Sequence, residues 1–186
     1  MTDALENHEQ TADGFGAVVD RVTDWDAPTP VKEWLARDVV THLVTWLPGF
    51  VGGGTGIEMP SIDTSDPVAA WRQHRAAVRQ LIEDHGDVTY RSTFLGEKPL
   101  ASAIDQFYTS DVFMHTWDLA RSQGIDPRLD EARCAGILHG MSRMDDAMLR
   151  GSGQFGPAIA APQGAAVQEQ LMGFLGRDPD FTPAHD

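Results

Sequence analysis

Three polar residues that could do chemistry follow one another at helical spacing near the middle of the chain: Asp111, His115 and Asp118. In a helix each residue advances about 100° around the axis, so the three would share a sector of roughly 60°. The residues between them are mostly apolar, which is typical of a buried helix with a polar stripe. Buried carboxylates need a cation, hydrogen bonds or water, and Asp-x-x-x-His is a ligand spacing that can hold a divalent metal. An ordinary hydrogen bond between an acid and a histidine is the alternative.

An earlier histidine supplies a third candidate ligand. His42 lies among apolar residues in a segment that predicts a helix ending at Pro48. Together with Asp111 and His115 it would give two imidazoles and one carboxylate, a set that leaves open positions as catalytic zinc sites do. A lone histidine on an apolar helix can equally be a core residue with its hydrogen bonds satisfied. Asp38, four residues earlier, could orient His42 or serve only the start of the helix.

Hydrophobic periodicity predicts an all-α fold that would position these residues. The expected helices span residues of about 4–23, 36–48, 66–85, 99–123, 131–149 and 167–175, with a flexible glycine-rich loop at 49–60 and an extended crossover at 88–96. Four substantial helices without a convincing sheet favour a bundle, in which sites form where polar side chains from different helices converge. We therefore expect a helical bundle in residues 1–150 and a C-terminal extension in residues 151–186 that packs on it.

Basic residues and cysteine narrow the chemistry further. Arg72, Arg75 and Arg79 repeat at helical spacing, either as a solvated face or with one of them holding an anionic ligand. Cys134 is the only cysteine, which excludes an intrachain disulfide and a cysteine-based zinc cluster. We interpret it as a small buried hydrophobe, and we interpret His139 as a packing residue. Any thiol chemistry would therefore use a thiol from a substrate or cosubstrate.

The composition limits the classes of partner. A formal net charge of -14 argues against nucleic acid, because phosphate binding draws its affinity from Lys and Arg. No run of about 18 apolar residues is present, and the acidic, polar N-terminus does not resemble a secretory signal. We expect a cytoplasmic protein that acts on small molecules without binding a membrane, as a monomer or a homodimer.

Three segments of the chain together resemble a known family. They are Trp25 to Leu43, His115 to Arg121, and the tail from Gly156-Pro157 to Gly176-Arg177-Asp178-Pro179. In this order they resemble the actinobacterial mycothiol-dependent maleylpyruvate isomerase-like proteins of the DinB-like metal-binding superfamily. The resemblance covers nearly the whole chain.

The resemblance implies a four-helix DinB-like bundle that binds a divalent metal, most often zinc, with nickel or manganese as alternatives. The implied ligands are His42, Asp111 and His115, with an aspartate where the characterised isomerase has a glutamate. That isomerase has a C-terminal domain, in place of which this chain has a short tail.

These observations lead to a functional hypothesis. The chain is expected to be a metal-dependent isomerase or thiol S-transferase that uses mycothiol as cosubstrate and acts on a small electrophile, with an anionic substrate as one option. The metal would bind the thiol and lower its pKa. Asp118 would orient a ligand or act as a general base, and Arg75 or Arg79 would hold a substrate carboxylate. A metal-dependent hydrolase and a non-catalytic protein that binds a metal or a small molecule are the alternatives.

Overall fold

The computed structural model describes residues 2–93, 96–151 and 155–183. Its α-helices are α1 (Thr2–Val19), α2 (Ala36–Thr55), α3 (Pro67–His85), α4 (Leu100–Ala103), α5 (Ser110–Ser122), α6 (Glu131–Met141), α7 (Asp146–Gly151) and α8 (Val167–Phe174). A π-helix, η1 (Ile104–Thr109), joins α4 to α5, and strands β1 (Thr89–Ser92) and β2 (Gly96–Pro99) form an antiparallel hairpin. The all-α class predicted from the sequence is confirmed.

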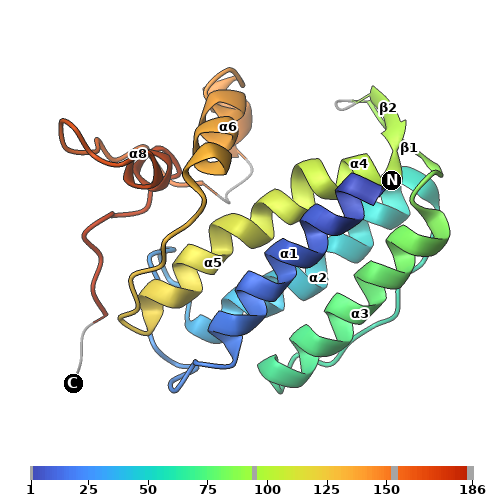
Figure 1. Cartoon of the computed structure of the whole chain (residues 1–186), viewed down its shortest axis with the longest axis horizontal. Helices are drawn as coiled ribbons and strands as arrows, with labels where there is room; N and C mark the ends of the chain where they lie inside the picture. The colour runs from blue at the N-terminus through green and yellow to red at the C-terminus, as the bar shows by residue number, and fades with distance from the viewer. Residues whose placement is uncertain (1, 94–95, 152–154, 184–186) are drawn as a thin grey trace.

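Four long helical segments form the bundle (Figure 1). α1 packs against α3 and α5, and α2 packs against the same two helices, so α1 and α2 occupy diagonal corners. Residues 20–35 carry the chain across from one corner to the other. The enclosed core contains fully buried side chains from all four segments, among them Phe15, Leu43, Leu47, Ile82 and Leu119. This arrangement turns one stripe of each helix toward a common interior.

The second helix is longer than the sequence predicts. α2 continues through Pro48 and includes Gly52, Gly53 and Gly54, which we expected in a mobile loop; it ends at Thr55 and is capped by Gly56 with a φ of 76°. Proline removes one N–H from the helix, but neighbouring packing can hold the remaining turns together. Gly54 supplies such packing, because a Cβ built there would lie 2.0 Å from Cε2 of Tyr90 on β1. Close approach to the hairpin therefore explains the glycine.

The third helix begins as predicted, whereas the segment after it differs. The Asp66 carboxylate accepts hydrogen bonds from the backbone N–H groups of Val68 and Ala69, and Pro67 occupies the first helical turn. Residues 88–96 were expected to form an extended crossover. Of these, Thr89–Ser92 form β1, which pairs with β2 at Gly96–Pro99, and residues 94–95 lie outside the described residues.

The segment from Leu100 to Ser122 is helical throughout, as predicted, but η1 interrupts its α-helical geometry. A π-turn contains one residue more than an α-turn, and such turns are frequent at functional sites. Here the π-turn ends at Thr109, two residues before Asp111. It takes up one extra residue between α4 and α5.

The C-terminal helices, drawn at the upper left of Figure 1, form a second, smaller core against α5. It contains Phe113, Met114 and Trp117 of α5 with Cys134, Leu171, Met172 and Leu175. The single helix expected over residues 131–149 was wrong, since α6 ends at Met141 and α7 begins at Asp146. His139, expected to pack, is exposed, whereas Cys134 is buried. α6 belongs to the expected bundle of residues 1–150, but it packs mainly on α8 of the expected C-terminal extension. The division at residue 150 stays a prediction.

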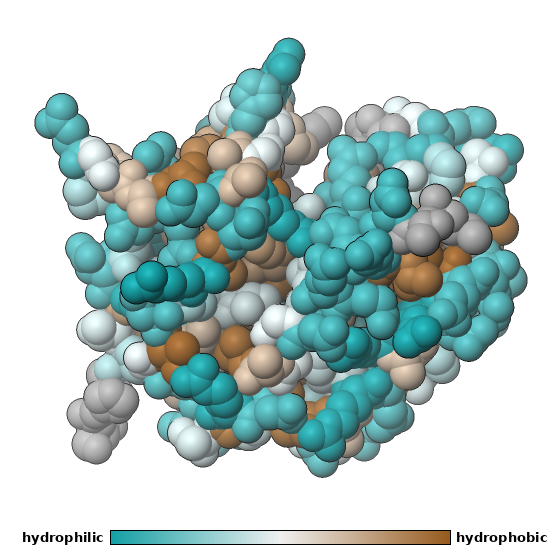
Figure 2. Space-filling view, in the orientation of Figure 1, coloured by the Kyte–Doolittle hydropathy of each residue, from teal (hydrophilic) through white to brown (hydrophobic). Residues whose placement is uncertain are grey.

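None of the described helices combines the length and apolar character needed to cross a membrane. Figure 2 shows a largely hydrophilic face, with apolar side chains gathered where α6 and α8 meet α5.

Candidate metal centre

α5 buries a polar stripe on an otherwise apolar helix. Every residue from Asp111 to Ala120 is buried, including His115 and the fully buried Asp118. Helical spacing of four and three residues places the three polar side chains along one face. Since burying an unpaired carboxylate is costly, the partners of these groups decide what the stripe can do.

The structure brings His42 of α2 to Asp111 and His115 of α5. His42 Nε2 lies 3.0 Å from Asp111 Oδ2, and His115 Nε2 lies 3.5 Å from Asp111 Oδ1. Taking one ligand atom from each residue, the three atoms all lie within 4.8 Å of one another. The imidazole rings of His42 and His115 meet edge to face with centroids 5.0 Å apart. This is a convergence of two imidazoles and one carboxylate from two helices.

Asp118 fixes the orientation of His115 from behind. Asp118 Oδ2 lies 2.9 Å from His115 Nδ1, and Arg177 donates to both carboxylate oxygens at 3.3 and 3.4 Å. Burial raises the pKa of Asp118, but the charge of Arg177 and the hydrogen bond from His115 outweigh it and hold the pKa below its usual value. An ionised Asp118 only accepts hydrogen bonds, so Nδ1 of His115 donates to it, and Nε2 is the ring nitrogen directed at Asp111 and left for a metal.

Two tryptophans enclose the cluster. Trp34 stacks on His115, with centroids 5.6 Å apart and an interplanar angle of 17°, and it also contacts His42. Trp46 donates its indole N–H to Asp111 Oδ2 at 3.0 Å. Burial raises the pKa of Asp111, but the charge of His115 and the hydrogen bonds from His42 and Trp46 leave it lowered. The carboxylate therefore stays ionised inside an aromatic wall.

Other residues considered from the sequence take different positions. Asp38 accepts a hydrogen bond from the backbone N–H of Leu35 at 2.8 Å, so it serves the start of α2. Arg75 pairs with Asp13 at 2.6 Å and with Glu9, both on α1. Arg79 pairs with Glu83 and with the same glutamate of α1. The structure thus places both arginines at the α1–α3 surface, where carboxylates already neutralise them, and does not bring them to the cluster.

Arg177 is the residue of this neighbourhood to which the sequence assigned no role. It is 59 residues from Asp118, so no spacing rule links the two. The only signal was its place in the Gly-Arg-Asp-Pro tail. Its burial at 3% exposure follows from its ion pair with Asp118 and its contact with the second core.

A pocket of about 890 Å³ opens beside the cluster and includes Asp111 in its wall. Its lining combines aromatic and methionine side chains from α2, η1, α5 and α6 with the segment that follows. This volume is typical of small-molecule sites. The pocket therefore offers space for a ligand next to the candidate metal ligands.

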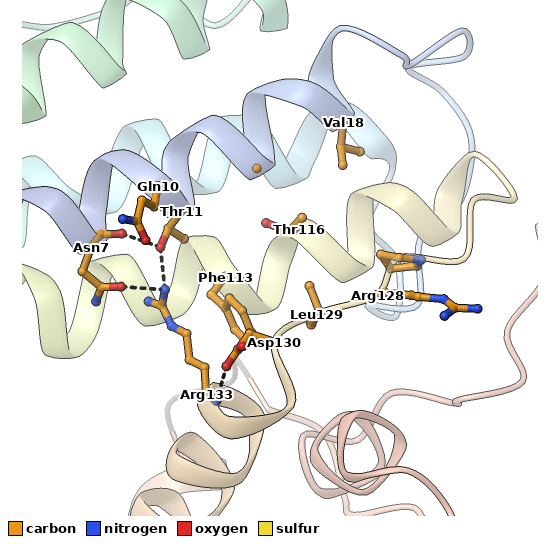
Figure 3. A pocket seen from close by; sticks show the side chains of 12 residues that line it. Asn7, Gln10, Thr11, Val18, Phe113, Thr116, Arg128, Leu129, Asp130 and Arg133 are labelled. Atoms are coloured by element: carbon orange, nitrogen blue, oxygen red, sulfur yellow. Dashed lines mark hydrogen bonds between the residues drawn. The ribbon is translucent and has the colours of Figure 1, made fainter.

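A second pocket, of about 680 Å³, lies on another face of α5, between α1 and residues 127–133 (Figure 3). Phe113 and Thr116 line it, whereas none of the three candidate ligands does. At one end Arg133 donates hydrogen bonds to Asn7, to Thr11 and to the backbone carbonyl of Thr109. Arg133 thereby fastens α6 to the bundle and contributes to the walls of both pockets.

The donor set fits a divalent metal of the zinc type. Zinc accepts imidazole nitrogen and carboxylate oxygen, and a catalytic site keeps three protein ligands and an open position. His115 is already oriented through its second ring nitrogen, as metal-bound histidines usually are. His42 also has a hydrogen bond to Asp111, and His115 has one to Asp118, so metal occupancy stays a prediction.

Comparison with known proteins agrees with the resemblance stated above. Residues 6–53 match the family model described as mycothiol maleylpyruvate isomerase N-terminal domain, a DinB-like helical domain. This segment covers most of α1 and α2 and contains His42, but it ends before Asp111 and His115. The match supports the predicted resemblance over this segment, and the helical fold is confirmed.

Two curated proteins are similar over almost the whole chain. Both are proteins of Mycobacterium tuberculosis described as uncharacterized, one from strain CDC 1551 / Oshkosh and one from strain H37Rv. Each is 28% identical over 188 residues, which span 94% of this chain and 98% of the relative. No solved structure matches the chain.

Proposed function

On the premise that residues 6–53 match the N-terminal domain of the mycothiol maleylpyruvate isomerase family, we propose that this chain is a metal-dependent enzyme that uses mycothiol as cosubstrate. The reaction is an isomerisation or a thiol S-transfer on a small electrophilic substrate. The observation that carries the proposal is the convergence of His42, Asp111 and His115 at the edge of a pocket large enough for a small molecule.

His42, Asp111 and His115 would hold the metal, with zinc as the first choice. When bound, such an ion supplies positive charge that lowers the pKa of a nearby thiol and so favours the thiolate. The ionised Asp111 contributes one negative charge to the site, and the two imidazoles contribute neutral nitrogen donors. Asp111 stands where the characterised isomerase of the family has a glutamate, so nickel and manganese remain alternatives to zinc as the bound metal.

Asp118 acts as a positioning residue rather than as a general base. Its side chain is fully buried, and its oxygens are engaged by His115 and Arg177. A base must reach the proton that it removes, and Asp118 has no open path to a ligand in the pocket. Its function is to hold the proton on Nδ1 of His115 and to fix the ring.

The attacking sulfur comes from outside the chain. Cys134 is the only cysteine, it is buried in the second core, and burial raises its pKa to about 11. A thiol of this kind is inert at neutral pH because the thiolate is the nucleophile. A low-molecular-weight thiol that enters the pocket beside Asp111 meets this requirement, and the family match points to mycothiol.

The experiment measures bound metal and thiol turnover in the same preparations. Metal content after mild purification is compared between the parent chain, His42→Ala and His115→Ala, with His85→Ala as control because His85 is exposed on α3. The two ligand variants should lose most of their metal and retain their helix content, and His85→Ala should retain its metal. Equal metal in all four proteins would refute the metal centre.

Turnover assays separate the candidate activities. Conjugation or isomerisation of a reactive alkene or epoxide with purified mycothiol supports the proposal. Metal-dependent turnover of an ester or amide without any thiol would replace it with a hydrolase, because an open metal site can also activate water. Saturable ligand binding with neither activity would indicate a binding protein without catalysis.

A further inference from the structure

The pocket beside Asp111 has an apolar wall. It has aromatic side chains from α2 and η1, namely Trp46, Phe50 and Phe107, and methionine and isoleucine side chains from α5 and α6, namely Met114, Ile137 and Met141. Methionine is flexible and polarizable, so it adapts to apolar groups of different shape. Burying such a group against this wall removes apolar surface from water, which is the main source of affinity in small-molecule pockets.

Two glycines of α6 keep this pocket open. Gly136 and Gly140 are four residues apart, so they lie on one face of the helix, and both line the pocket. A Cβ at either position would meet nothing within 4 Å, and neither glycine has a positive φ. Glycine weakens a helix relative to alanine, yet here no turn or close contact requires it. The missing side chains have one structural effect, which is free space opposite α5.

The charged groups of the pocket are already engaged. Asp111 belongs to the metal cluster, and Asp105 accepts a hydrogen bond from Asn7. Arg133 donates to the side chains of Asn7 and Thr11 and to the Thr109 carbonyl, all of them neutral acceptors that hold α6 on α1. Two carboxylates against one arginine give no charge complementarity to a dianion.

We propose that the pocket between α5 and α6 selects an electrophile with an uncharged apolar body, such as an aryl or branched alkyl group, and presents it beside Asp111. This inference rests on the proposed function and names the substrate class for the same site. The apolar body lies against the methionines and aromatic rings, in the space left by Gly136 and Gly140. The reactive carbon then lies toward the His42–Asp111–His115 cluster.

The test uses N-phenyl-1-naphthylamine, an uncharged probe that becomes fluorescent in apolar surroundings, on the full chain without thiol. Gly140→Leu fills the pocket, and Gly53→Leu is the matched control, because Gly53 is an exposed α2 glycine whose Cβ would also meet nothing within 4 Å. We expect Gly140→Leu to weaken probe binding at least tenfold and Gly53→Leu to change it less than twofold. Circular dichroism and melting temperature verify that both variants fold. Equal affinity in the parent chain and Gly140→Leu overturns the proposal.

A competition experiment on the unmodified protein tests the same preference for an uncharged apolar ligand without mutation. 1-Naphthalenemethanol should displace the probe, whereas maleate, a small dianion, should fail to do so even at 100-fold higher concentration. If maleate displaces the probe at the concentration at which 1-naphthalenemethanol does, the proposed apolar ligand class is contradicted.

The outcomes also separate this inference from the proposed function. Selective probe binding without any mycothiol turnover removes the enzyme proposal and leaves the apolar pocket in place. Mycothiol turnover of a small dianionic electrophile by a protein that does not bind the probe leaves the enzyme proposal and removes this inference.

Discussion

At the scale of single residues, the candidate site depends on which nitrogen of His115 carries a proton. Asp118 accepts from Nδ1 and is held ionised by Arg177, so Nε2 is the ring nitrogen that faces Asp111 and is left for a metal. The position of Asp118 could be predicted from its spacing on α5. Its dependence on Arg177 could not, because the two residues meet only after the C-terminal segment has folded onto the bundle.

Asp118→Asn tests this arrangement. The amide keeps the size of the side chain but loses the charge opposite Arg177, and its NH₂ group can face His115 and move the ring proton to Nε2. We expect zinc affinity to fall about 10-fold to 100-fold, as for other partners of metal-bound histidines. Chelator competition measures the change, with the exposed Asp87→Asn as control. Unchanged affinity in Asp118→Asn would show that Asp118 does not orient the ligand.

At the scale of elements, periodicity located the long helices but misplaced several of their ends. Asp66-Pro67 predicted the start of α3 because its capping is local. Pro48 suggested an early end for α2, whereas packing of Gly54 against Tyr90 extends it to Thr55. The π-turn before Asp111 carries no sequence pattern that distinguishes it from an α-turn. Tertiary contacts, which a single sequence does not display, decide these features.

Gly54→Ala measures the contact between α2 and the hairpin. The added Cβ would lie 2.0 Å from the buried ring of Tyr90, so the hairpin or the ring must shift. We expect the free energy of unfolding to fall by about 1–3 kcal/mol, although alanine favours helices. Gly53→Ala, with no atom within 4 Å of its Cβ, should instead raise stability by up to about 1 kcal/mol. Urea denaturation compares the two, and a stabilising Gly54→Ala would contradict the close contact.

At the scale of the whole molecule, the bundle buries two histidines that are not part of the candidate metal centre. His8 of α1 and His74 of α3 are each 1% exposed, and both contact Tyr108 with ring centroids 5.7 Å from it. Within the described residues, Nε2 of both histidines and the tyrosine hydroxyl have no hydrogen-bond partner. Burial, with the nearby Arg75 and Arg133, lowers the pKa of His8 to about 4, and burial with the nearby His8 lowers that of His74 to about 4.

These two histidines make the stability of the fold depend on pH. Between pH 6.5 and pH 4 the unfolded chain binds protons on them that the folded chain does not, so the free energy of unfolding decreases as the pH falls. Their contribution is complete above pH 6.5, and its loss approaches about 3 kcal/mol for each histidine near pH 4. Urea midpoints at pH 7.0, 6.0 and 5.0 should decrease in this order. His74→Leu should reduce the slope, and a parent chain equally stable at pH 7.0 and 5.0 would disprove the burial of neutral histidines.

The π-turn between α4 and α5 makes the number of residues in this segment as informative as their identity. Deleting one amino acid from Ile104–Thr109 would turn η1 into a regular α-helical turn and leave α4 and α5 in nearly the same orientation, because a π-turn takes up one extra residue. The residues of the turn itself, among them the pocket-lining Phe107, would change direction. In an alignment of relatives, a one-residue gap at this point would therefore signal a rebuilt wall beside Asp111 even where every other residue is unchanged.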